Sequence, residues 1–269
     1  MLLAMHTAVG VLVVLIVNAL PFWGVFGWNL DPAQLVLLFW FENLANTVLI
    51  SARILVHRRL TRKRGHFNVH MTTTTKRGGK TTTKVNRNGS ALVAFLLPTL
   101  VFTIAHGIFL VILVKMLMPA DADVAVFSSQ IKLAGITLVA ALTLGFFGDL
   151  VGIREKPFAW IRQMSELALG RVVGIHLILL FGLFTIVMWQ TSKLVLGAIL
   201  LLKLMADLSG VIPQQKMEEQ PPKWLRFLGR FNKPGEESFE AYWQREHRQE
   251  KTAHARDEEV LSEEEYARR

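Results

Sequence analysis

Long apolar stretches alternate with short polar ones over most of the chain. A helix needs about 20 predominantly apolar residues to cross the hydrocarbon core of a bilayer. We expect six such helices, at residues 2–25, 33–56, 91–118, 130–153, 171–189 and 194–212. The pattern therefore predicts an all-α fold: a polytopic transmembrane helical bundle at 1–213, followed by a charged helical or disordered cytoplasmic tail at 214–269.

The polar segments between and after these helices differ in character. Residues 57–90 hold ten Lys or Arg, no acid and many threonines, which is typical of a disordered low-complexity loop. Residues 154–170 are amphipathic and basic, and favour a short interfacial segment. Residues 223–231 alternate basic and apolar side chains, while Ser262 and Glu265 have the spacing of a helix capping box.

Composition narrows the class of protein. Hydrophobic residues make up 52% of the chain, which is too much for an ordinary soluble domain. Cysteine is absent, so disulfides, thiolate metal sites and cysteine catalysis are excluded. The net charge of +9 is concentrated in the 57–90 loop, which indicates membrane topology rather than nucleic-acid binding.

The distribution of basic residues predicts orientation. The loops after the second and fourth helices are basic, whereas those after the first, third and fifth are nearly free of Lys and Arg. The positive-inside rule then places both termini in the cytoplasm of a cell with this protein in its inner (plasma) membrane. The expected partners are the lipid bilayer and anionic headgroups, bound at the basic loop and at 223–231; protein partners stay unknown and no nucleic acid is expected.

Ionisable side chains interrupt the apolar helices. Glu42 lies near the middle of the second helix, where a charge costs about 2.5–3.5 kcal/mol on insertion scales. Asn46 follows one turn later on the same helix face, which should point into the bundle. Other helices contribute His106, Asp149, Arg171, His176, Lys203 and Asp207.

A structural interpretation is that these groups neutralise one another. Glu42 and His106 both fall near the expected midplane, which favours a Glu42–His106 pair. Lys203 and Asp207 have i, i+4 spacing on one helix and would form a local ion pair. Asp149 would then pair with Arg171 or His176. Such pairs would fix helix positions without any chemistry.

Three functional interpretations compete with it. The first is a pathway for a small polar solute, ion or proton lined by Glu42, Asn46, His106, Arg171, His176 and Asp207. The second is a membrane enzyme or redox protein in which a metal is held by Glu42, His106, His176 and Asp207, or haem by the two histidines. The third is a membrane scaffold that recruits partners through its tail. The residues name no cofactor.

Four stretches together resemble a known family. They are FWFENLANTVLISARI, FTIAHGIF, RVVGIHLILLFGLF and LLLKLMADLSG, on the second, third, fifth and sixth helices. Their order resembles that in a bacterial family of integral membrane proteins classed only as a domain of unknown function. The resemblance implies six helices with the same polar positions, and no activity. At the fourth helix the chain has GFFGDLVGIREKP, without the His and Tyr that the family carries there.

Overall fold

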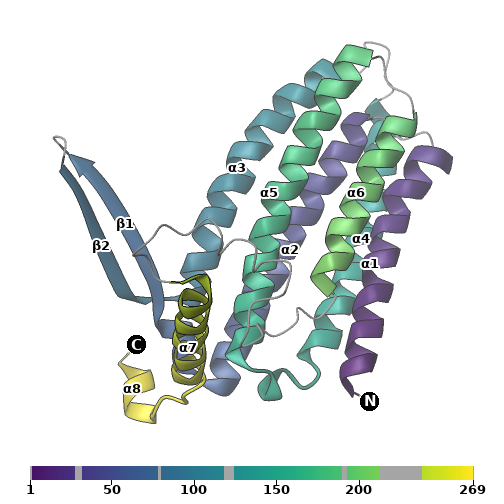
Figure 1. The fold of residues 1–269 in the computed structure, drawn as a ribbon. Coiled ribbons are helices and arrows are strands. Elements are labelled where there is room, and N and C mark those ends of the chain that lie inside the picture. Colours follow the sequence, from purple (N-terminus) through teal and green to yellow (C-terminus); the bar gives the residue numbers. More distant parts are fainter. Residues whose placement is uncertain are drawn as a thin grey trace.

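The computed structural model describes residues 2–27, 32–77, 80–117, 124–189, 193–211 and 238–268. Long helices pack side by side in an elongated bundle, and the described chain begins and ends at the same end of it (Figure 1). The bundle helices are α1 (Leu2–Gly27), α2 (Pro32–Thr61), α3 (Ala91–Leu117), α4 (Val124–Leu150), α5 (Phe158–Trp189) and α6 (Lys193–Val211).

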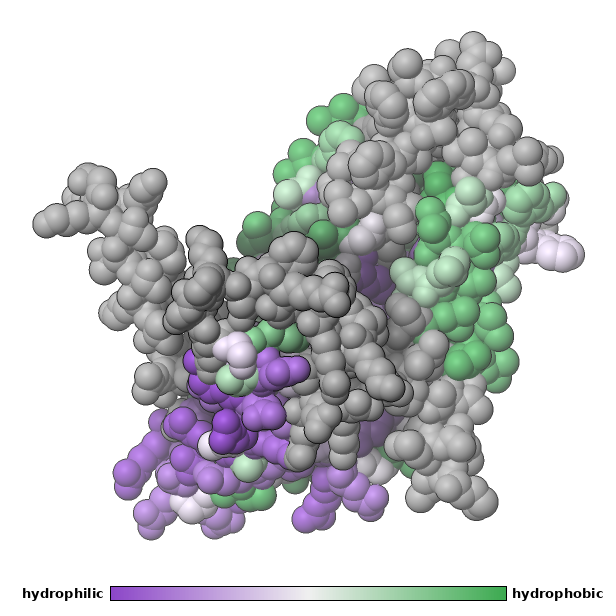
Figure 2. Space-filling model, viewed as in Figure 1, coloured by the Kyte–Doolittle hydropathy of each residue, from purple (hydrophilic) through white to green (hydrophobic). Residues whose placement is uncertain are grey.

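Four helices in the described part of the chain are long and apolar enough to cross a membrane. Their apolar segments are Gly10–Gly27, Gln34–Thr61, Ala91–Ile112 and Ile131–Leu150. Many large apolar side chains on these helices face outward, such as Leu144 at 71% and Ile108 at 63% exposure. Hydrophobic residues accordingly predominate along the right and upper-left sides of the bundle where it is coloured in Figure 2. These features indicate a membrane protein.

Helix α2 lies at the centre of the bundle. Its residues Leu35 and Phe39 pack with side chains of α1, α3 and α6, and Leu38 packs with α1 and α4. Further along, Ile54 packs against Phe95 of α3 and the first turn of α5. Because α2 takes part in all three apolar clusters, every other long helix can be positioned relative to it.

Helix α5 begins earlier than the sequence pattern predicts. The predicted start is residue 171 and the observed start is Phe158, so most of the expected interfacial segment at 154–170 forms the first turns of the helix. A short 3₁₀ turn, Ile153–Glu155, precedes it. Phe158 and Ile161 are buried against α2 and α3, which explains why these residues join the bundle instead of an interface.

Residues 57–90 were expected to form a disordered loop, and this prediction is wrong for part of them. The loop contains β1 (Val69–Arg77) and β2 (Lys80–Gly89), which pair as antiparallel strands with Thr74 opposite Thr83. Threonine is β-branched and favours extended backbone, so its abundance here was a strand signal as well as a low-complexity one. The all-α prediction therefore holds for the bundle and not for this loop.

The C-terminal part carries α7 (Phe239–Asp257) and α8 (Glu263–Ala267). The capping box is present at α8, where Ser262 and Glu265 exchange side-chain and backbone hydrogen bonds. Hydrophilic residues gather at this end of the molecule in Figure 2. The 223–231 segment, for which membrane contact was predicted, lies outside the described residues.

Candidate functional site

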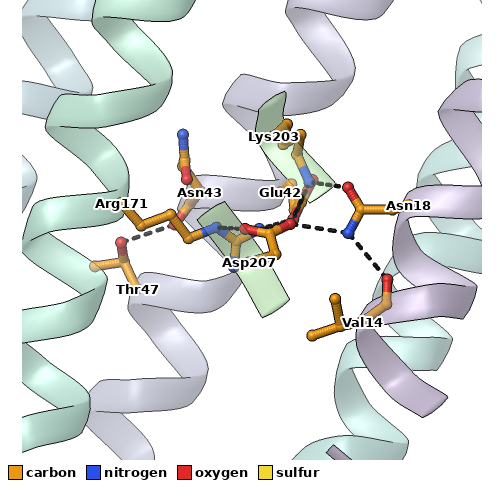
Figure 3. A network of polar contacts seen from close by, with 8 residues as sticks. All are labelled: Val14, Asn18, Glu42, Asn43, Thr47, Arg171, Lys203 and Asp207. Atoms are coloured by element: carbon orange, nitrogen blue, oxygen red, sulfur yellow. Dashed lines mark hydrogen bonds and ion pairs between the residues drawn. The ribbon is translucent and has the colours of Figure 1, made fainter. Parts of the chain in front are cut away.

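The site is a cluster of charged side chains inside the helical bundle. Glu42 projects from the central helix α2 and is only 2% exposed. Arg171 reaches it from α5, Lys203 and Asp207 from α6, and the amide of Asn18 from α1 (Figure 3). Residues up to 189 positions apart in the chain thus meet at one place.

Lys203 is the most enclosed charged residue of this charged cluster. Its side chain is 1% exposed, and its Nζ donates to Asp207 Oδ2 at 2.8 Å and to Glu42 at 3.2 Å. A third hydrogen bond runs from Nζ to Asn18 Oδ1 at 3.0 Å. The ammonium group has three protons, so these contacts use its full donor capacity.

Arg171 joins the same two carboxylates from the other side. Its Nη2 donates to Glu42 Oε1, and its Nε lies 2.8 Å from Asp207 Oδ1. The Arg171 side chain is 24% exposed, whereas those of Glu42, Asp207 and Lys203 are at most 3% exposed. Arg171 is therefore the most exposed of the four charged side chains, although its Nε atom is itself buried.

Asn18 completes the charged cluster with uncharged polar groups. Its Nδ2 donates to Asp207 Oδ2 and to the Val14 carbonyl oxygen, both at 2.9 Å. Its Oδ1 accepts from Lys203. Asn18 is 1% exposed, so these three bonds satisfy an amide that would otherwise be costly to bury.

Formal charges within the cluster cancel, with two carboxylates and two basic groups. Each carboxylate contacts both basic groups, so removing one residue leaves an uncompensated charge in an apolar bundle. Breaking a buried ion pair by removing one partner is strongly destabilising. The arrangement can hold four helices in register. Its chemistry would also allow one of the four charged side chains to exchange its ion-pair partner for a charged solute or a proton.

The predicted pairs are partly right. Lys203 and Asp207 form the expected i, i+4 ion pair. The Glu42–His106 pair is wrong, because Glu42 contacts Arg171 and Lys203 while the His106 ring stacks on Phe102. His106 lies on α3, which approaches α2 through a different contact, between Trp40 Nε1 and the Thr103 carbonyl oxygen at 3.0 Å.

Asp149 also has partners other than those expected. Its carboxylate lies 2.9 Å from Arg53 Nε and 3.3 Å from Lys156 Nζ. The prediction that it pairs with Arg171 or His176 is wrong for Arg171, which is engaged with Glu42 and Asp207. Arg53 and Asp149 form a second ion pair, outside the charged cluster.

Two further predicted site residues, Asn46 and His176, make no contact with the charged cluster that the structure describes. Asn46 is one turn after Glu42 on α2, and its Nδ2 is buried without a hydrogen-bond partner among the described residues. His176 falls on α5, but its side chain lies outside the part of the chain that the structure describes.

The predicted metal ligands are not brought together as a set. Glu42 and Asp207 are close, but basic groups occupy their oxygen atoms. Within the described residues, no three His, Asp or Glu side chains are grouped closely enough to hold a metal ion. A cation between Glu42 and Asp207 would have to displace Lys203 or Arg171.

Sequence reasoning missed Asn18 as a member of the site. The signal was present, because Asn18 is an isolated amide in the apolar first helix and such side chains face partners within a bundle. Lys203 was recognised only as the local partner of Asp207. Its contact with Glu42 spans 161 residues and has no local pattern.

Comparison with known proteins places the chain in a family without giving it an activity. No curated protein and no solved structure matches it. Residues 2–254 match a family of unknown function, DUF6498. The match covers nearly the whole chain and agrees with the resemblance drawn from its four polar motifs. The protein is therefore a member of the DUF6498 family of unknown function.

Proposed function

We propose that the protein is a multi-pass protein of a bacterial inner membrane, with six spanning helices in 1–213 and both termini in the cytoplasm. Helices α5 and α6 run beside the four apolar spans, and both ends of the described chain lie at one end of the bundle (Figure 1). The links at 28–31, 118–123 and 190–192 contain no Lys or Arg, which favours this orientation.

We further propose that it binds a small polar solute, an ion or a proton at the charged cluster and moves it across the bilayer. The observation that carries this proposal is the burial of four mutually paired charges from three helices, reached through the partly exposed side chain of Arg171. Ionisable residues within membrane spans commonly mark ion and substrate pathways.

Charge balance defines how a ligand would enter. A solute carboxylate can take the place of Glu42 or Asp207 on Arg171, and a solute ammonium can take the place of a basic group on a carboxylate. A proton can neutralise one carboxylate and release a basic partner. In each case binding opens an ion pair between helices, which couples occupancy to helix movement. Asn46, His106 and His176 are the proposed further lining of the pathway.

Proteoliposomes with a trapped pH-sensitive dye test this function. An inside-negative potential is imposed, and sodium, glutamate, arginine or betaine is added outside. We expect the wild-type protein to change internal pH, alone or with one of these solutes, and the Glu42→Gln/Arg171→Gln variant to lose the response.

The matched control is Arg53→Gln/Asp149→Asn, which removes the ion pair outside the charged cluster. It should keep the response if its protein is folded. A wild-type protein that responds to neither the potential nor any solute contradicts proton transport at the charged cluster, alone or coupled to one of these solutes. If both double variants lose the pH response equally, then loss of any buried ion pair is enough to abolish it. The charged cluster would then have only a structural role.

A further inference from the structure

The C-terminal segment folds back onto the end of α2. Residues 258–265 are here called the C-terminal clasp, and within them Val260 lies opposite Lys63 in an antiparallel bridge. Arg64 N donates to the Glu259 carbonyl oxygen at 2.8 Å, and Leu261 N donates to the Arg62 carbonyl oxygen at 3.0 Å. Leu261 is 3% exposed, so the clasp is packed as well as hydrogen-bonded.

The C-terminal clasp is acidic where it contacts the basic residues at and just after the end of α2. The basic end of α2 comprises Arg58, Arg59, Arg62, Lys63 and Arg64. The clasp presents acids to three of them, in ion pairs that link Lys63 to Glu258 at 2.6 Å, Arg64 to Glu259 at 3.1 Å and Arg62 to Glu263 at 3.1 Å. Glu265 lies 3.8 Å from Arg64 as a fourth contact.

The position of this basic end points to a second partner. It overlaps and directly follows the end of the apolar segment Gln34–Thr61, which is long enough to span a membrane. Clusters of Lys and Arg immediately beside a spanning helix attract anionic lipid headgroups. The acidic clasp therefore occupies cations that lie where such headgroups would meet the protein.

We propose that the basic end of α2 is a binding site for anionic lipid headgroups and that the C-terminal clasp competes with them for it. In a bilayer poor in anionic lipid the clasp stays docked; in one rich in anionic lipid the headgroups displace it. This inference requires α2 to span the membrane, and it does not depend on solute binding at the charged cluster.

The exposed ion pairs of the clasp and the contacts of single basic residues with an anionic membrane are comparable in strength, so the one can replace the other. The side chains of Glu263, Glu259 and Glu265 are 88%, 55% and 53% exposed, and exposed ion pairs contribute little each. The attraction of one basic residue to an anionic membrane surface is of similar size. The three exposed acids thus make weak contacts that a headgroup can replace, and once these are lost the Lys63–Glu258 pair, the two backbone hydrogen bonds and Leu261 are left to hold the clasp.

Displacement of the clasp would also break contacts between the end of α2 and the start of α5. The second carboxylate oxygen of Glu258 accepts from Ala159 N in the first turn of α5 at 3.2 Å. Lys63 Nζ also donates to the Lys156 carbonyl oxygen at 3.0 Å, just before α5. The clasp therefore ties the end of α2 to the start of α5, the two helices that carry Glu42 and Arg171.

The absence of cysteine allows a direct test. Val260→Cys introduces a single thiol at a position that is 67% exposed, and a spin label there reports the mobility of the clasp. The labelled protein is placed in vesicles of phosphatidylcholine or of equal parts phosphatidylcholine and phosphatidylglycerol. We expect an immobilised label in the first and a mobile one in the second.

Variants locate the exchange. Glu259→Gln/Glu263→Gln/Glu265→Gln should mobilise the label in phosphatidylcholine, whereas Glu264→Gln should not, because Glu264 pairs with Arg268 at 4.0 Å rather than with the basic end. Arg62→Gln/Arg64→Gln should leave the label equally mobile in both vesicle compositions.

Three results would overturn the proposal. The first is a label whose mobility is the same in both compositions for the protein with intact acids. The second is lipid dependence that persists after Arg62 and Arg64 are replaced. The third is release by inorganic phosphate added to phosphatidylcholine vesicles at constant ionic strength, since that would make the site one for free anions.

Discussion

The ammonium of Lys203 lies 3.2 Å from the carboxylate of Glu42, and the two side chains are 1% and 2% exposed. Lys203→Met should therefore leave Glu42 and Asp207 with Arg171 as their remaining basic partner. We expect a loss of about 3–5 kcal/mol in the free energy of unfolding, because an unpaired charge would be buried.

Detergent-based unfolding measures this loss. Arg162→Gln is the control, since it breaks an exposed ion pair with Glu166 on α5 and should change stability by less than about 1 kcal/mol. Similar effects of the two substitutions would show that Lys203 is not buried among carboxylates.

Asn18 should matter for stability although it carries no charge. Asn18→Ala removes three hydrogen bonds and leaves Lys203 and Asp207 each without one buried partner. The expected cost is about 1–3 kcal/mol. Asn18→Asp should cost more, because it places a third carboxylate beside Asp207. The same unfolding assay checks both, and a neutral Asn18→Ala would contradict the contacts assigned to this amide.

Gly65 and Gly170 provide a matched pair of glycine substitutions. A Cβ added at Gly65 would lie 2.2 Å from Phe158 Cδ1, whereas one added at Gly170 would meet no atom within 4 Å. We expect Gly65→Ala to destabilise by about 1–3 kcal/mol through overpacking. Gly170→Ala should stabilise α5 by up to about 1 kcal/mol. Thermal unfolding of the two variants should therefore shift in opposite directions.

His66, just beyond the end of α2, should make the stability of the protein depend on pH. His57 Nε2 lies 3.0 Å from the Lys156 carbonyl oxygen, which can only accept, so this nitrogen carries the proton. His57 Nδ1 then accepts from His66 Nε2 at 2.7 Å. Burial, followed by the nearby His57, Arg58 and Lys63, lowers the pKa of His66 from 6.5 to about 3.

Because the folded-state pKa of His66 is below the unfolded one, the unfolded chain binds more protons between these values. Stability is therefore complete above pH 6.5 and falls by up to about 1.4 kcal/mol per pH unit below it, towards pH 3. His66→Gln keeps a donor for His57 and should flatten this slope. His254→Gln, at an exposed position on α7, should not. Equal slopes in both variants would contradict the assignment.

Helical spacing was sufficient to predict part of the charged cluster. It placed Glu42 on the inward face of α2, and the side chain is buried. It also paired Lys203 with Asp207, because residues four apart on a helix are neighbours. These features depend on one helix alone, which is why the sequence could show them.

Contacts between helices depend on how far along the bundle axis each side chain lies, and the sequence predicts this position poorly. The predicted start of α5 was 13 residues late, a difference of about 20 Å along a helix at 1.5 Å per residue. Arg171 therefore lies well inside α5, where it reaches Glu42, whereas His106 had been chosen on apparent depth. The contact of the clasp with α2 joins positions about 195 apart in the chain, and no local pattern marks it.

A double-mutant cycle on Glu42 and Arg171 tests most directly that the charged cluster joins α2 to α5. Unfolding would be measured for the wild type, Glu42→Gln, Arg171→Gln and the double variant. Each single change should cost about 3–5 kcal/mol, and the double variant should cost at least about 2 kcal/mol less than the sum. Additive costs, with a coupling below about 0.5 kcal/mol, would contradict the pairing of these two residues.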